Sequence, residues 1–339
     1  MKQHSTAALP FLLGSILWLG ALAQAAEITG ASDAKWIEDV GGTVIKDPAG
    51  RITGADLRGS WVTDMDLRRL VQLPYLTYLD LSLTRITDQG MQELKNLPGI
   101  VDLNLRYAEY VTDEGMAAIK GWKKLKRLNV HGAKFSDTTL EHISGIMTLE
   151  SLNIGSGMVT DIGLERLTGL PNLKELTIGG NKLTDNGLHA LRQMPHLTYL
   201  DLAGRQGTYA NVWAIRMSDV GLGAILALKE LRDLRFGCTS LNVGIEGATF
   251  AQVSATSVTT GWLEKMKALP KLENLKLQGC DRVDDDSIPA LAALPALRQV
   301  DLKGSGVTEK GLAALKAAKP GIQVYSGPWV AKAANFRNN

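Results

Sequence analysis

Hydrophobic residues recur along the chain with a period of about 24 residues. The segment that starts at Leu76 has the sequence L-T-Y-L-D-L-S-L-T-R-I-T-D-Q-G-M-Q-E-L-K-N-L-P-G. The same template is recognised ten times, with starts at Ile52, Leu76, Ile100, Leu125, Leu149, Leu173, Leu197, Leu231, Leu272 and Leu297. Ten copies of one short unit indicate a repeat architecture, because no single unit of this length can bury its own leucines.

Each unit predicts one strand followed by one helix. The L-x-x-L-x-L stretch alternates, as in Leu79 and Leu81, which is typical of a strand with one buried face. The I/V-T-D-x-G-L-x-x-L stretch has helical spacing, and its Thr or Asp can cap the helix. We therefore predict an α/β solenoid, with a curved parallel sheet on the concave face, helices on the convex face and a leucine core between them.

The two ends of a solenoid expose leucines and therefore need caps. Before the repeats, Ser32 to Val40 predicts a short helix with Ser32 as its N-cap, and Thr43 to Lys46 predicts a hairpin with the Ile52 strand. We assign residues 26–51 to an N-terminal cap, 52–326 to the solenoid and 327–339 to a C-terminal tail. Ile322 to Ser326 is expected to form a terminal strand.

The first residues have the features of a targeting segment. Ala7 to Ala23 is almost continuously apolar and follows the basic Lys2. Ala23-Gln24-Ala25 fits the small-x-small rule, so residues 1–25 are expected to be a cleaved signal peptide. An uncleaved membrane anchor is the alternative. With cleavage, we expect a secreted or periplasmic protein with no stable membrane insertion.

The repeat resembles a known family. The pattern L-x-x-L-D-L-S-x-T-x-V-T-D-x-G-L, which runs from Ile52 to Ser326, resembles that of leucine-rich-repeat proteins. Its V-T-D-x-G-L version is similar to the cysteine-containing subtype of ubiquitin-ligase substrate receptors, and more so to exported bacterial repeat proteins. The resemblance implies the solenoid fold and protein–protein binding. A ubiquitin role is disfavoured by the predicted signal peptide and by the lack of room for an F-box.

Two neighbouring units are longer than the template. The unit from Leu197 to Glu230 has 34 residues and the unit from Leu231 to Lys271 has 41. The extra residues form insertions at 205–216 and 239–256, each between a strand and the following helix. Equivalent positions of adjacent repeats lie about 5 Å apart, so the insertions should emerge side by side on one rim.

The insertions and the neighbouring strand face supply the candidate binding residues. Long loops on a rigid frame often carry function, and Tyr, Trp and Arg are enriched at binding hot spots. The candidates are Tyr199, Asp201, Arg205, Tyr209, Asn211, Trp213, Arg216, Asp233, Arg235 and Lys276. The alternative is that the two loops only pack against each other.

The two cysteines, Cys238 and Cys280, follow the strands of adjacent repeats. Export favours a disulfide between them. However, Cys280 occupies an inward position of the template and Cys238 lies one place earlier, so two thiols that point apart remain the alternative. Two cysteines without clustered histidines do not predict a zinc site. The run Asp284 to Asp286 fits helix capping better than a calcium loop. No metal and no cofactor are expected.

A net charge of +2 gives no reason to expect a nucleic-acid partner. No phosphate loop, dinucleotide fingerprint or nucleophile elbow is recognised, so no catalytic residue is assigned. The sequence predicts an exported, monomeric, non-catalytic scaffold that binds a protein ligand through its concave face and the two insertions. Two alternatives remain. One is a hydrolase-like enzyme with a pocket roofed by the insertions, over carboxylates such as Asp201. The other is a cell-envelope spacer.

Overall fold

The structure is a computed structural model that describes residues 34–97, 99–204, 206–208, 211–238 and 258–328, with the backbone alone for 206–208 and 211–213. The expected signal peptide, most of the C-terminal tail and the 239–256 insertion therefore lie outside the described residues. Arg205 and Tyr209 of the shorter insertion also lie outside them.

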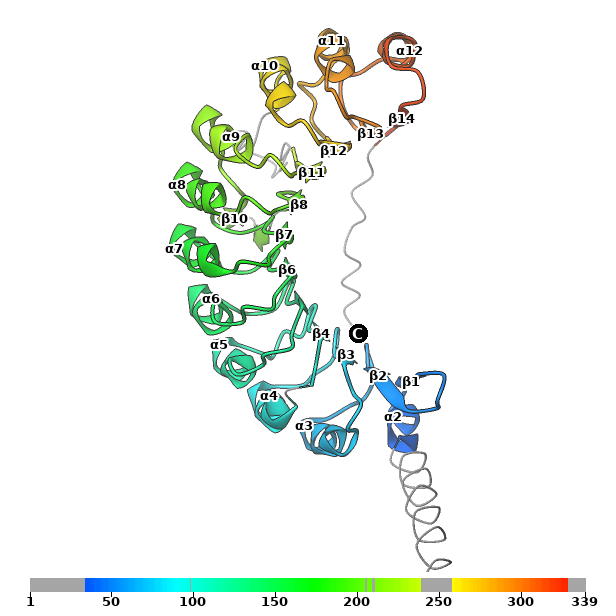
Figure 1. The fold of residues 1–339 in the computed structure, drawn as a ribbon, viewed down its shortest axis with the longest axis vertical. Helices are drawn as coiled ribbons and strands as arrows, with labels where there is room; N and C mark the ends of the chain where they lie inside the picture. Colours follow the sequence, from blue (N-terminus) through cyan, green and yellow to red (C-terminus); the bar gives the residue numbers. More distant parts are fainter. Residues whose placement is uncertain (1–33, 98, 205, 209–210, 239–257, 329–339) are drawn as a thin grey trace, which may run out of the picture.

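The described residues form an open arc with one curved sheet along its inner side and a row of helices along its outer side (Figure 1). The sheet has twelve strands, which are β1 (Thr43–Lys46), β2 (Ile52–Asp56), β3 (Tyr78–Asp80), β4 (Asp102–Asn104), β5 (Arg127–Asn129), β6 (Ser151–Asn153), β7 (Glu175–Thr177), β8 (Tyr199–Asp201), β11 (Asp233–Arg235), β12 (Asn274–Lys276), β13 (Gln299–Asp301) and β14 (Gln323–Tyr325). From β2 to β14 every neighbouring pair is parallel and keeps one register, so that equivalent residues of successive repeats pair. The predicted solenoid is confirmed.

The helices are short and follow the strands one by one. They are α2 (Lys35–Asp39), α3 (Asp64–Leu67), α4 (Asp88–Glu93), α5 (Asp113–Met116), α6 (Asp137–Ile143), α7 (Asp161–Glu165), α8 (Asp185–Leu188), α9 (Asp219–Ile225), α10 (Thr260–Lys265), α11 (Ile288–Ala292) and α12 (Glu309–Ala318). Tighter 3₁₀ turns cover Arg68–Gln72, Leu94–Asn96, Ala117–Ile119, Arg166–Gly169, His189–Gln193, Met266–Ala268 and Asp285–Ser287. Several of these turns end one or two residues before a proline, which cannot continue a helix.

The predicted helix and hairpin cap covers the first repeat. β1 pairs antiparallel with β2, and α2 buries Trp36 and Ile37 against the core. The predicted N-cap was wrong, because α2 begins at Lys35 and its N-cap is Ala34, which makes no side-chain capping bond. At the other end, β14 is the expected terminal strand.

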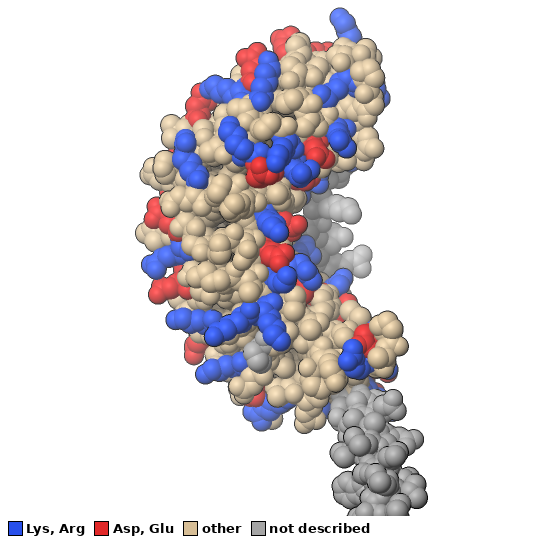
Figure 2. All heavy atoms as spheres, in the orientation of Figure 1, with Lys and Arg blue, Asp and Glu red and all other residues tan. Residues whose placement is uncertain are grey.

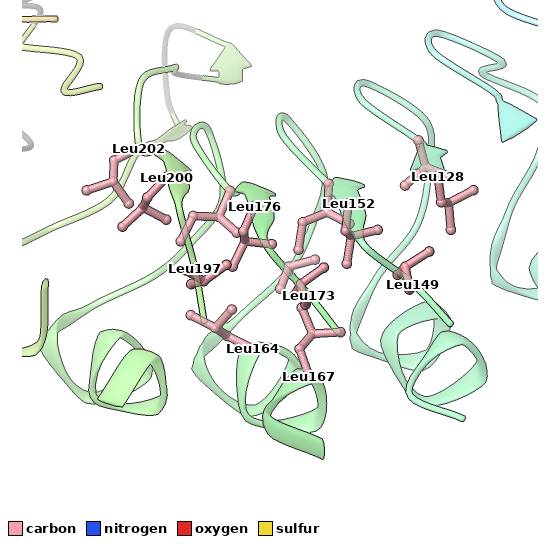
Figure 3. Packing of buried hydrophobic residues seen from close by; sticks show 14 of the residues in the cluster. Leu128, Leu149, Leu152, Leu164, Leu167, Leu173, Leu176, Leu197, Leu200 and Leu202 are labelled. Atoms are coloured by element: carbon pink, nitrogen blue, oxygen red, sulfur yellow. The ribbon is translucent and has the colours of Figure 1, made fainter. Parts of the chain in front are cut away.

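Leucines from strands and helices fill the space between the two layers (Figure 3). Leu152 and Leu176 point inward from successive strands, and they meet Leu164 of α7 and Leu167 of the 3₁₀ turn that follows it. All four are at most 1% exposed. Because each repeat contacts only its neighbours, this core is continuous along the arc rather than centred at one point.

A ladder of hydrogen bonds joins the start of each helix to the start of the next. Asp137 of α6 accepts one hydrogen bond from the backbone N–H of Thr160 at 2.8 Å and one from its hydroxyl at 2.6 Å. The same pair of bonds links Asp64 to Thr87, Asp88 to Thr112, Asp113 to Ser136, Asp161 to Thr184, Asp185 to Ser218 and Asp285 to Thr308. This Asp–Thr ladder explains why the T-D dipeptide recurs.

The glycine of the D-x-G motif makes room for the ladder. A Cβ added to Gly163 would overlap the Asp137 carboxylate, and Gly90, Gly115, Gly187, Gly221 and Gly311 meet the aspartate of the preceding repeat in the same way. Thr139 occupies this position in α6 and donates its hydroxyl to Asp113 at 2.6 Å. A larger residue is therefore accommodated where its side chain bonds to the ladder.

The ladder is interrupted on both sides of α10, which follows the longer insertion, and the Thr260 hydroxyl is instead 2.8 Å from the Ser287 hydroxyl. Trp262 stands at the glycine position of α10, and Thr260 stands at the aspartate position. Asp219 instead accepts hydrogen bonds from the Trp262 Nε1 at 2.5 Å and the Lys265 Nζ at 2.7 Å. The Trp262 ring packs beside Phe236, with 6.4 Å between their centroids. Between α9 and α10, contacts of Trp262 thus stand where an aspartate and a threonine or serine form hydrogen bonds in most other repeats.

Candidate binding surface

The inner face of the arc carries a hollow of about 400 Å³ between β3 and β8. Tyr78 and Tyr199 lie at its two ends. Its other lining residues are Asp102, Asn104, Arg127, Leu128, Asn129, Ser151, Leu152, Asn153, Glu175 and Thr177. Ser151 and Asn153 of β6, in the middle of the floor, have short side chains that leave space above the sheet. The hollow is therefore a broad polar surface with an aromatic side chain at each end.

The polar side chains of the floor are held in fixed orientations. Asn129 and Asn153 each accept the backbone N–H found two residues later, at 3.1 and 3.0 Å. Arg127 donates to Asp102 at 2.8 Å. A surface whose side chains are already oriented loses little conformational entropy when a ligand binds.

Asp201, which we predicted to face a ligand, is covered. It is 6% exposed and accepts hydrogen bonds from the Ala203 N–H at 2.8 Å and the Tyr199 hydroxyl at 3.3 Å. Burial raises the pKa of Asp201 above its ordinary value, and the nearby Arg235 guanidinium opposes that change. Burial, and after it the Asp201 charge, raises the pKa of Tyr199 to about 12. Asp201 therefore positions its neighbours and offers little surface of its own.

Hydrogen bonds continue from Asp201 across the next three strands. Arg235 donates to Asp201 at 3.3 Å and to the Gln278 Oε1 at 3.2 Å. Gln278 in turn donates to Asp301 of β13 at 2.6 Å. Tyr199, Asp201 and Arg235 are thus brought together on the inner face.

The other predicted strand-face residues are less directly connected. Lys276 lies half-buried on β12, and its charge lowers the pKa of Asp201 as a minor contribution. Asp233 accepts a hydrogen bond from Asn274 at 2.6 Å. Neither residue lines the hollow.

The shorter insertion contains a hairpin. Its strands are β9 (Gln206–Thr208) and β10 (Asn211–Trp213), which pair antiparallel with Asn211 opposite Thr208 and Trp213 opposite Gln206. The Asn211 and Trp213 side chains are outside the description, as are Arg205 and Tyr209. Arg216, just after the hairpin, is exposed. The proposed contact residues of the hairpin remain a prediction.

Cys238 and Cys280 form a disulfide in the structure, with their Cα atoms 4.6 Å apart. The bridge joins the turns after β11 and β12, on either side of the 239–257 segment. Cys238 follows Phe236, which packs against Trp262, by two residues.

Tyr78 was not among the predicted binding residues and the hollow was not predicted, although the sequence carries a signal for both. Thr77 to Leu81 and Thr198 to Leu202 share the sequence T-Y-L-D-L. In both copies the tyrosine hydroxyl donates to the aspartate at 3.3 Å, and burial raises the pKa of Tyr78 to about 12 as well. The repetition of this pair marks the two ends of the hollow.

The structure gives little sign of other kinds of site in the part of the chain that it describes. There, no group of His, Cys, Asp and Glu side chains could hold a metal ion. Nor, within those residues, does any helix combine the length and apolar character needed to cross a bilayer. On the face drawn in Figure 2, basic and acidic side chains are interspersed along the arc.

The fold and its hollow inner face define a repeat solenoid with an open binding surface. Family models described as leucine-rich repeats match residues 147–206 and 72–95. The chain is a leucine-rich-repeat protein.

A solved structure of an internalin from Listeria monocytogenes is similar to this chain, with a TM-score of 0.52 and 21% sequence identity, and the match covers 79% of this chain and 71% of that one. At this level of identity, the similarity concerns the fold alone. None of the curated proteins compared with the chain matches it.

Proposed function

We propose that this protein is an exported, non-catalytic scaffold that binds a protein ligand through its concave face, in the hollow, and through the two insertions. The observation that carries the proposal is the hollow itself, a preoriented polar floor between Tyr78 and Tyr199. Aromatic side chains at the ends of a polar surface are typical of protein-binding sites. Leucine-rich-repeat proteins in general act in protein–protein interaction.

Export is supported by two features of the chain. The apolar stretch from Ala7 to Ala23 precedes a small-x-small motif, as signal peptides do. The disulfide between Cys238 and Cys280 is of a kind that persists in oxidising compartments. Both support a secreted or periplasmic location.

The test is a comparative capture experiment from the exported fraction of the source cells. The baits are the intact protein, a Ser151→Arg variant that fills the hollow, a deletion of residues 205–216, and a Ser144→Arg control. Ser144 follows α6 on the outer side of the arc, so the control adds the same side chain away from the hollow. We expect Ser151→Arg to lose partners that the control retains.

The deletion separates the contribution of the rim from that of the hollow. A partner that is lost with the deletion but kept by Ser151→Arg would place binding on the hairpin. Equal capture by all four baits would rule out both surfaces.

A further inference from the structure

One exposed residue per repeat lies three positions before the aspartate that starts each helix. The members are Trp61, Arg85, Tyr110, Lys134, Met158, Lys182 and Arg216, and Arg282 holds the same position in a later repeat. We call these residues the rim row. It contains cations and apolar side chains and no acidic residue, and only Arg216 belongs to the binding residues predicted from the sequence.

Backbone hydrogen bonds hold successive members of the row in register. The N–H of Met158 donates to the carbonyl of Phe135 at 3.0 Å, and the N–H of Lys182 donates to that of Val159 at 3.0 Å. Arg216 follows the same rule despite the insertion, because its N–H donates to Leu183 at 2.9 Å. From Lys134 to Arg216 the row is therefore a continuous line along the edge of the solenoid where the chain leaves the sheet.

Several cations of the row have no carboxylate partner. Within the described residues, Arg85, Lys182, Arg216 and Arg282 form no ion pair, whereas Arg127 of β5 and Arg232, just before β11, are paired with Asp102 and Glu273. Lys134 lies over the Tyr110 ring, 5.9 Å from its centroid.

The carboxylates of the Asp–Thr ladder run parallel to the row and weaken its long-range field. The oxygens of these carboxylates accept hydrogen bonds from the next repeat. The carboxylates therefore do not pair with the cations of the row. Glu109 and Glu114 are the exposed acidic residues beside the Tyr110 segment. Binding to this row would therefore depend on short-range contacts.

The apolar end of the row has no explanation in folding. Trp61 is 81% exposed, and a hollow of about 450 Å³ beside it is lined by Leu83, Arg85 and the turn from Gly59 to Asp64. Leu83 is 52% exposed and has a φ of 58°, at a turn position where Gly59, Gly132, Gly180, Gly204, Gly279 and Gly304 stand in other repeats. A leucine is disfavoured in this left-handed conformation. Since Leu83 gains no burial in return, strain of this kind points to a role in binding.

We infer that the rim row binds an extended acidic segment of a protein partner, with an apolar residue of that segment seated in the hollow beside Trp61. Strands of adjacent repeats are about 5 Å apart, so Arg85, Lys134 and Lys182 recur roughly every 10 Å. An extended peptide advances about 3.3 Å per residue, so an acidic residue at every third position would meet each cation in turn.

The residues between those acidic positions would face Tyr110 and Met158. The aliphatic Leu83 and Met158 favour a peptide over an acidic polysaccharide, because they offer neither a stacking face nor a polar contact to a sugar. This surface is distinct from the concave hollow, so the inference goes beyond the proposed function.

The test uses fluorescence anisotropy with the intact mature protein and a labelled peptide of about fifteen residues, long enough to span the row when extended. The peptide carries Glu at every third position and Leu at one end, and a second version carries the Leu at the other end. A scrambled peptide of equal composition serves as the ligand control.

The protein variants are Arg85→Gln/Lys134→Gln/Lys182→Gln, Trp61→Ala and the matched control Lys95→Gln/Lys123→Gln/Lys124→Gln, which removes the same charge from exposed positions outside the row.

We expect the periodic peptide to bind better than the scrambled one and to weaken as salt is raised. The row variant should lose about tenfold in affinity and the control variant little, in keeping with modest exposed ion pairs. Trp61→Ala should also weaken binding. Equal losses in the row and control variants, or equal binding of both peptides, would overturn the inference. The inference would also be overturned if a polyuronate, an acidic polysaccharide, displaced the labelled peptide and bound more tightly than the peptide does.

Discussion

Aspartates on the concave face and aspartates in the ladder have opposite environments. Asp201 on the concave face is buried, and burial raises its pKa. For Asp113 in the ladder, burial also raises the pKa, but the hydrogen bonds that it accepts from Ser136 and Thr139 outweigh this effect and lower the pKa below 3.8. Ionised Asp201 therefore lowers the stability of the fold, although its hydrogen bonds orient the side chains of the inner face. Ionised Asp113 instead raises the stability of the fold.

The ladder glycines give the first prediction. Gly163→Ala should destabilise the protein by about 1–3 kcal/mol, because the new methyl group overlaps the Asp137 carboxylate and disturbs its two hydrogen bonds. Urea denaturation measures the effect. Gly169→Ala is the matched control, since no atom lies within 4 Å of a Cβ added there. A similar loss in both variants would show that the ladder is not the cause.

A second prediction concerns the pH dependence of Asp113. Its pKa is lowered in the folded state, so its ionised form adds stability above the unfolded-state pKa, and that contribution is lost as the pH falls below 3.8. The difference in unfolding free energy between the wild type and Asp113→Asn should therefore shrink between pH 7 and about pH 3. A difference that stays constant over this range would contradict the assignment.

At the scale of single elements, the junction between β11 and β12 departs most from the repeat. No ladder bond joins α10, which follows β11, to α9 or to α11, and Trp262, Phe236 and the Cys238–Cys280 disulfide supply other contacts there. Charged pairs also cross the junction, including Lys271 with Glu230 and Arg232 with Glu273. Because exposed ion pairs contribute little, the disulfide and the aromatic packing should carry most of the stability of this junction.

The disulfide supports a third prediction. Cys238→Ser/Cys280→Ser should lower the free energy of unfolding by about 2–4 kcal/mol, mainly because the unfolded chain loses a loop closure between residues 42 positions apart. Urea denaturation of the variant and the oxidised wild type gives this value. A thiol assay on the unfolded wild type should find none that react, and two reactive thiols would exclude the bridge.

The sequence predicted the frame well because a periodic pattern of leucines determines it. The number of strands, their order and the terminal strand all followed from the template. The cover over Asp201 could not be predicted, because it depends on Arg235, which reaches Asp201 from the neighbouring strand, 34 positions along the chain. The break in the ladder at Trp262 was predictable in principle, since a tryptophan stands where other repeats have glycine. The hollow was harder to predict, because it depends on which short side chains of different strands lie next to one another in the sheet.

On the scale of the whole molecule, stability should be a sum over neighbouring interfaces, so the weakest interface decides how the chain unfolds. With the disulfide intact, we predict a single cooperative transition. After reduction, the repeats from β12 onward should exchange amide hydrogens sooner than those before β11, because no ladder bond joins α10 to α9 or to α11. Hydrogen exchange with and without reductant tests this prediction, and uniform protection along the reduced chain would contradict it.

The Asp–Thr ladder also limits how such a chain can change length. Most repeats supply one carboxylate to the unit after them and one pair of donors to the unit before them. Removing or duplicating a segment of one full period therefore keeps each existing Asp–Thr pair of the ladder. A change of half a period would instead leave an aspartate without its hydrogen-bond donors. Growth by whole-unit duplication is the route that this bonding scheme tolerates, and the two long units show where additions fit, in the turn between the end of a strand and the next rung.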